Sequence, residues 1–278
     1  MATSDLDQQG LLQPGGFDNS SNDNNEDEND PSAMSLIDHL EELRWRIFKC
    51  LIAVAVGVVI AFIFRDWLIH ILDAPLPLSA NSIGGKEGHK LVMTGLGEAF
   101  TVAIKLSIVF GLVFALPVIL YQLWAFISPG LYDKEKKHAV PFIVLGLLLF
   151  VIGVTLGYFI LQFPVSFLIN FGAENFTELI SANSYFSFVS FFLLLFGAVF
   201  ELPLVLTFLA LIGIVTEHFL KDKRAMAHVG LWAAATIVTP GGDLYSPIFI
   251  GVALSLLYEF SILLIHFAVK KDPAETIA

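Results

Sequence analysis

The fold of this chain is decided by residues 184–215, which read SYFSFVSFFLLLFGAVFELPLVLTFLALIGIV. The stretch is long enough to cross a bilayer as a helix, because about 20 apolar residues span the hydrocarbon core. Glu201 is its only charged residue. A carboxylate at the centre of a membrane helix costs roughly 2.5–3.5 kcal/mol, so it usually faces a partner helix or a watery cavity. We therefore predict a membrane protein with a functional carboxyl among its helices.

The composition agrees with a membrane protein. Of the 278 residues 56% are hydrophobic and 15% are charged, and the mean hydropathy is +0.77. The net charge of −11 comes mostly from residues 1–33, which hold eight acids and no lysine or arginine. We expect a disordered acidic tail over 1–33, a membrane domain over 34–271 and a short tail over 272–278. The single cysteine, Cys50, excludes an intrachain disulfide, and we expect no nucleic-acid partner, cofactor or metal.

Apolar runs of bilayer length predict six transmembrane helices in an all-α bundle. They cover residues 47–64, 106–127, 139–161, 185–214, 225–238 and 248–269. The fifth run has only about 14 residues and the sixth contains Glu259, so both spans should be short. Prolines at positions 117, 141 and 203 should interrupt the spans, which predicts a curved bundle.

Basic residues predict the orientation of the helices. If all six runs cross, the basic residues within 44–49, 134–137, 221–224 and 270–271 share one side, and the loops after the third and fifth runs have none. By the positive-inside rule both termini are cytoplasmic, in the cell (inner or plasma) membrane or in an internal photosynthetic one. The opposite connections, 65–99 and 162–183, should form short surface helices.

Two cytoplasmic segments combine carboxylates with apolar surface. Residues 35–46 begin with a capping box and should form an amphipathic helix that leads into the first span. The simplest interpretation of Glu42 and Arg46 is an i,i+4 pair worth only about 0.3–0.5 kcal/mol. In the second segment Trp124 fits an interfacial aromatic belt, and Glu135 lies in the loop that follows. Carboxylates beside apolar surface suit the binding of arginines that precede a hydrophobic peptide.

Five motifs, taken in order, resemble the TatC family, the multi-spanning receptor subunit of the twin-arginine protein translocase. They are HLxELRxR at 39–46, APL at 74–76, PVILYQxWAFxxPxLYxxE at 117–135, FELP at 200–203 and TP at 239–240. Each motif is weak alone, but five in this order on this topology are specific. The resemblance covers residues from about 35 to 267, and the acidic tail lies outside it.

The resemblance implies a receptor for the twin-arginine signal peptides of folded proteins. It also implies an oligomeric complex with small single-span subunits of the TatA/TatB type, driven by the proton-motive force. By position, Glu42, Arg44, Phe126 and Glu135 would bind the signal peptide.

A second set of residues would serve partner docking and translocation. The resemblance places Glu201 in the concave interior and assigns Trp232 and Thr239 to a partner-binding edge around the fifth span. Asp243 would belong to the same region, but the stretch TPGGD at 239–243 is one residue longer than the TPPD of many family members.

Two other classes of function fit parts of the sequence. A proton- or ion-coupled secondary transporter would use Glu201 and Glu259, although the chain has no internal repeat. An intramembrane protease would pair Asp133 with Asp243, but these fall in loops on opposite sides of the predicted membrane. The HExxH and GxSxG patterns are absent from the sequence. We therefore expect no catalytic residue and a protein that is not an enzyme.

Overall fold

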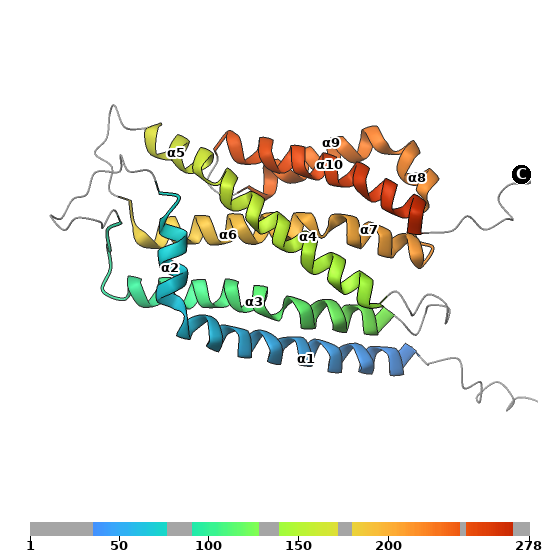
Figure 1. Cartoon of the computed structure of the whole chain (residues 1–278), viewed down its shortest axis with the longest axis horizontal. Helices are drawn as coiled ribbons and strands as arrows, with labels where there is room; N and C mark the ends of the chain where they lie inside the picture. Colours follow the sequence, from blue (N-terminus) through green and yellow to red (C-terminus); the bar gives the residue numbers. More distant parts are fainter. Residues whose placement is uncertain (1–35, 77–90, 128–138, 172–179, 240–242, 269–278) are drawn as a thin grey trace, which may run out of the picture. The chain divides into compact units, whose positions relative to one another are not determined.

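The structure is a computed structural model, and it describes residues 36–76, 91–127, 139–171, 180–239 and 243–268. The chain divides into two units, Met1–Glu41 and Glu42–Ala278. The second unit holds every described helix except the first residues of α1 (Figure 1). The described helices are α1 (Leu36–Ile63), α2 (Arg65–Asp73), α3 (Glu98–Ile127), α4 (Ala139–Ile160), α5 (Gln162–Asn170), α6 (Ala182–Phe200), α7 (Leu202–Leu211), α8 (Glu217–Asp222), α9 (Arg224–Val238) and α10 (Tyr245–Ala268).

Five helical segments in the described part of the chain are long and apolar enough to cross a membrane. They are Leu40–Ile63, Glu98–Phe126, Val140–Asn170, Ala182–Leu211 and Tyr245–Phe267. The third combines α4 with α5, and the fourth combines α6 with α7. The 15-residue α9 is about 22 Å long, less than the hydrocarbon thickness of about 30 Å. The prediction of an all-α, multi-pass membrane protein is therefore confirmed, with α9 as the short element.

The expected short sixth span is wrong, because α10 has 24 residues. Pro247 lies in the first turn of α10, where a helix needs no backbone N–H, so the helix begins before the apolar run does. Glu259 does not interrupt the helix, since its carboxylate forms an ion pair with Arg224 of α9 at 2.9 Å.

The prolines act differently from one another. Pro141 lies in the first turn of α4 and interrupts nothing, contrary to the prediction. Pro117 lies inside α3, which continues past it. Pro203 lies in the first turn of α7, directly after the break at Glu201 that separates α6 from α7. The long apolar run 184–215 thus contains two helices, α6 and α7, that meet at Glu201.

Helices α4 and α6 approach closely because glycines lie where they cross. A Cβ placed on Gly153 would lie 2.7 Å from the carbonyl oxygen of Phe196, and one on Gly197 would lie 2.5 Å from the Phe150 ring. The rings of Phe192 and Phe196, 4.8 Å apart between centroids, fill the buried side of α6. Close approach through small residues is the usual basis of helix association in lipid.

At the end where α3 and α6 begin, α2 lies across the long helices (Figure 1). The hydroxyl of Tyr158 in α4 donates to the carbonyl of Ile71 at 3.0 Å, and that of Tyr185 in α6 donates to Leu72 at 2.8 Å. These bonds satisfy two carbonyls in the last turn of α2, where carbonyl groups have no N–H partner within the helix. Short helices form in both long connections, as α2 and α5, and their location at the membrane surface stays a prediction.

Candidate functional site

A polar cluster joins α1 to α3 in the half of each helix nearer to the predicted cytoplasmic segments. Oε1 of Glu42 accepts a hydrogen bond from Nε of Arg46 at 3.0 Å and a second from Nη2 of the same guanidinium. Nη1 of Arg46 donates to Oε1 of Gln122 at 3.3 Å. We call Glu42, Arg46 and Gln122 the α1–α3 polar cluster. The i,i+4 pair predicted from sequence is confirmed, and the bond to Gln122 is an addition.

The cluster depends on how α1 lies against α3. A Cβ on Gly111 would lie 2.8 Å from Cα of Val58, and one on Gly57 would collide with the Gly111 carbonyl. Two facing glycines therefore let the backbones meet, and the same contact brings Arg46 within reach of Gln122. Gln122 was not singled out from the sequence. The sequence contained a clue to its role, because Gln122 is the only amide side chain in α3.

Within the cluster, the Glu42 carboxylate and the Arg46 guanidinium are oriented for hydrogen bonding to each other. The side chains of Arg46 and Glu42 are only 18% and 25% exposed, so water screens their interaction less than it screens a surface pair. A carboxylate accepts guanidinium N–H groups along its two oxygens, which gives both strength and orientation. In this structure the Glu42 carboxylate binds the guanidinium of Arg46.

The other described residues predicted for peptide binding lie on the same two helices, α1 and α3. Arg44 is exposed on α1, and Phe126 is half-buried at the end of α3. Glu135 lies outside the described residues. The interfacial location expected for Trp124 is wrong, because its ring is 3% exposed and packs on Phe142 of α4 with centroids 4.7 Å apart. Trp124 fixes α3 against α4 instead of facing the membrane surface.

Glu201 lies at the break between α6 and α7. Both of its carboxylate oxygens are shielded from solvent, and neither has a hydrogen-bond partner in the described part of the chain. Oε2 points towards α4, where a Cβ on Gly146 would lie 3.2 Å from it. Burying a polar group without a partner is costly, so a site of this kind calls for a functional explanation.

The residues predicted for the partner-binding edge lie on α9 and at the start of α10. The Trp232 ring is 39% exposed and covers Gly251, whose Cβ would lie 2.8 Å from the indole. The hydroxyl of Thr239 donates to the Ala235 carbonyl at the end of α9. Large apolar side chains on the outward face of α9 are exposed: Met226 by 66%, Val229 by 71% and Ile237 by 82%.

Asp243 has a local structural role. It is buried, and its Oδ1 accepts a hydrogen bond from the backbone N–H of Ser246 at 2.6 Å. This is the geometry of a helix N-cap, here at the start of α10. The described contact of Asp243 is therefore with the first turn of α10.

Glu259 belongs to a packing contact between α9 and α10. Its Oε2 is paired with Arg224 at 2.9 Å, and its Oε1 lies 3.3 Å from Nε2 of His228. Glu259 therefore connects α9 to α10 through its two side-chain partners. Only one of the two carboxyls invoked for a transporter is without a partner in the described residues.

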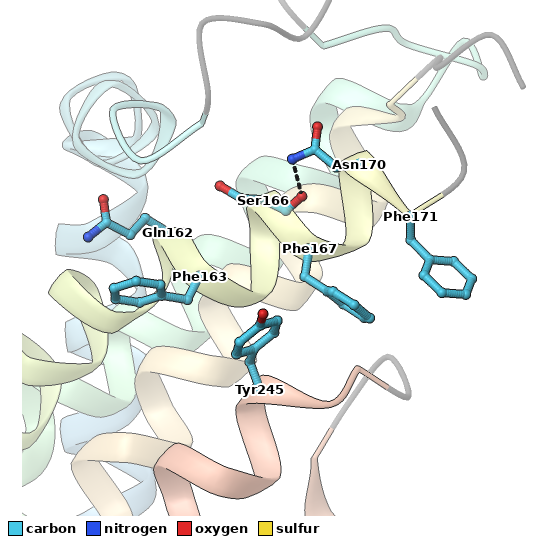
Figure 2. Close-up of a pocket in the computed structure, with 7 residues that line it drawn as sticks. All are labelled: Gln162, Phe163, Ser166, Phe167, Asn170, Phe171 and Tyr245. Carbon is cyan, nitrogen blue, oxygen red and sulfur yellow. Dashed lines mark hydrogen bonds between the residues drawn. The ribbon is translucent and has the colours of Figure 1, made fainter. Parts of the chain in front are cut away.

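A separate pocket of about 570 Å³ opens between α5 and the start of α10, and Figure 2 shows aromatic rings from both helices facing it. Rings of Phe167 and Tyr245 meet edge to face with centroids 5.3 Å apart. Its lining residues are Gln162, Phe163, Ser166, Phe167, Asn170, Phe171 and Tyr245. None of these is charged, and none was predicted as a site residue.

The comparison with known families decides the identity of the fold. The family model described as Sec-independent protein translocase protein (TatC) matches residues 38–252. This chain belongs to the TatC family. The resemblance inferred from the five sequence motifs is confirmed.

TatC proteins from several bacteria are similar over nearly the whole chain. The protein from Desulforapulum autotrophicum is 41% identical over 240 residues, which cover 86% of this chain and 87% of that protein. The protein from Escherichia coli K12 is 34% identical over 238 residues, with coverage of 85% and 90%. A crystal structure of the twin arginine translocase receptor TatC matches with 34% identity and a TM-score of 0.69, covering 84% of this chain and all of that one.

Membership in the TatC family makes this chain a membrane-embedded subunit of a protein translocase, which works in a complex. The family consists of membrane receptors, not enzymes.

Proposed function

We propose that this protein is the receptor of a twin-arginine translocase and binds the signal peptides of folded proteins through the α1–α3 polar cluster. The observation that carries the proposal is the half-buried Glu42 carboxylate, held by a guanidinium within a TatC-family chain. A solved relative is described as a twin arginine translocase receptor. A peptide arginine would offer Glu42 the same planar donor that Arg46 offers.

The remaining contacts of the signal peptide follow from this assignment. Arg44 and Phe126 lie on α1 and α3, the helices that carry the cluster, and Phe126 offers apolar surface to the hydrophobic part of the peptide. Glu135 would provide the carboxylate for the second arginine. The acidic segment 1–33 would remain a separate solvated tail, with the membrane domain over 34–271 and a short tail over 272–278.

Glu201 is proposed to receive a polar side chain from a single-span partner of the TatA/TatB type. The support is its unsatisfied, shielded carboxyl at a helix break, which an incoming helix could satisfy. The exposed apolar face of α9, with Trp232 and Thr239 on the same helix, would form a second contact surface for such a helix. Asp243 would act indirectly by holding the start of α10. Export through the oligomeric complex would draw on the proton-motive force.

We further propose six crossings, with both termini cytoplasmic, in the inner or plasma membrane. The distribution of lysine and arginine supports this orientation. The short α9 would complete its crossing by thinning the bilayer or by sheltering beside α10, on which it packs through Trp232 and Ala235. Breaks and short elements of this kind also support the concave bundle inferred from the resemblance.

Binding of a labelled twin-arginine peptide to the full chain in membranes tests the proposal. Glu42→Gln should weaken binding about 10- to 100-fold, because a hydrogen bond to a charged group contributes about 1.5–3 kcal/mol. The matched control is Glu41→Gln, one residue earlier and exposed. A twin-lysine peptide should bind weakly to the parent, since lysine lacks the planar fork. Equal binding by Glu42→Gln and the parent would mean that the cluster is only an interfacial anchor.

A further inference from the structure

Lys105 lies in a groove between α3 and α6. It is near the start of α3, whereas Gln122 of the α1–α3 polar cluster is near the end of that helix. Nζ of Lys105 donates to Oδ1 of Asn183 at 2.8 Å and to Oγ of Ser187 at 3.1 Å. Both acceptors are uncharged. Within the residues that the structure describes, no carboxylate forms an ion pair with Lys105, which is exposed at the surface of the protein.

The two acceptors hold the ammonium in one place. Asn183 donates its backbone N–H to Oε1 of Glu98 at 2.8 Å, and the hydroxyl of Ser181 donates to the same oxygen at 2.6 Å. The other Glu98 oxygen accepts from the Thr94 hydroxyl at 2.9 Å. Glu98 is thus occupied by neutral donors while it fixes Asn183. An ammonium has three N–H donors, and the described residues accept two of them, so a third is available to a ligand.

Beyond the ammonium, the groove is apolar and open, with a volume of about 290 Å³. Its walls include Ile108, Val109, Phe191 and Leu194. The serine at position 190 also borders it, but its hydroxyl donates to the Phe186 carbonyl at 2.5 Å. A ligand that fits both parts of the groove has a negatively charged headgroup for Lys105 and a hydrocarbon chain for the apolar walls.

The expected depth of Lys105 in the bilayer agrees with a ligand of this kind. The 30 residues of α3 give a helix about 45 Å long, which exceeds a hydrocarbon core of about 30 Å by several ångströms at each end. Lys105 is seven residues, or about 10 Å, from the first residue of α3, so its long side chain reaches the headgroup level. From Ser187 to Leu194 the groove runs about 10 Å further towards the membrane centre.

We propose that this groove binds an anionic phospholipid, with the phosphodiester on Lys105 and one acyl chain along α3 and α6. Charge complementarity selects the head, and the apolar walls select the chain. The lipid would belong to the leaflet at the α2 end of the bundle. It would hold α3 against α6 at the end where Lys105, Asn183 and Ser187 already connect the two helices.

Photolabelling tests the site on the full chain reconstituted in vesicles. The probes are phosphatidylglycerol and phosphatidylcholine, each carrying a diazirine on an acyl chain, and the labelled residues are mapped by mass spectrometry. On the parent, phosphatidylglycerol should label residues 106–109 and 191–194 about fivefold more than phosphatidylcholine, the ratio that corresponds to one basic side chain at an anionic surface. Equal labelling by the two lipids overturns the proposal without any variant.

Variants separate charge from shape. Lys105→Gln should remove the preference for phosphatidylglycerol, and Lys105→Arg should retain it. Leu194→Trp keeps the charge but fills the groove, so labelling by both lipids should fall. The matched control is Lys49→Gln, an exposed lysine of α1, which should leave labelling unchanged. A preference that survives Lys105→Gln, or one that Lys49→Gln also removes, shows general attraction to anionic lipid and refutes the site.

Discussion

Replacing Glu201 with leucine should stabilise the isolated protein while it weakens recruitment of the single-span partner. The carboxyl is shielded from solvent and has no partner in the described residues, so it contributes an unsatisfied polar group to the folded state. Such a group costs about 1–3 kcal/mol, and leucine has a similar volume. The expected gain is therefore about 1–3 kcal/mol, and at about 2–4 °C per kcal/mol the midpoint should rise by several degrees.

Three variants separate polarity from charge. Glu201→Gln keeps a hydrogen-bond donor of the same shape and should recruit the partner almost normally. Glu201→Leu should lose recruitment, and Glu201→Lys should lose most, because a cation buried without a counter-ion is costlier than either. None of them should change binding of a twin-arginine peptide at the α1–α3 polar cluster.

The assays are thermal unfolding of the detergent-solubilised protein and site-specific crosslinking to the single-span partner in membranes. Their combination is diagnostic, since a purely structural residue would move stability and recruitment in the same direction. If Glu201→Leu is less stable than the parent, the carboxyl has a partner within the isolated protein and the reasoning fails. A Glu201→Gln variant that recruits the partner but abolishes export would instead indicate that the residue cycles a proton.

Three further predictions follow from other parts of the chain. Gly57→Leu should separate α1 from α3, because even a Cβ there collides with the Gly111 carbonyl, and proteolysis of the solubilised variant should release α1 sooner than in the parent. The hydrogen bond from Lys221 holds the pKa of the Glu217 carboxyl below its ordinary value of 4.5. The ionised carboxylate therefore contributes its full stabilisation of the folded state above pH 4.5, and this stabilisation is lost as the pH falls through the lowered pKa. The gap in thermal midpoint between the parent and Glu217→Gln should accordingly close on acidification. A reporter fused after Lys271 should face the cytoplasm, and an external signal would reduce the number of crossings to five.

Much of the fold could be predicted from local sequence. Long apolar runs between charged segments locate helices in lipid, because every backbone polar group there must be satisfied within the helix. The Glu42–Arg46 pair was also predictable, since residues four apart on a helix are neighbours. Asp243 carried a readable local signal too, as an acidic residue just before a helix, but the prediction followed the family pattern and missed its role as a cap.

The sequence by itself determined the membrane class, the family and the isolation of Glu201 within its apolar run. Only the tertiary structure decided which side chains meet across helices: Arg46 with Gln122, Glu259 with Arg224, and Trp124 with Phe142. In a membrane helix the lipid-facing and the packed sides are both apolar, so hydrophobic periodicity does not reveal which side is buried. That choice depends on where small residues allow two backbones to approach, as Gly57 and Gly111 do, and it is made between helices far apart in the chain.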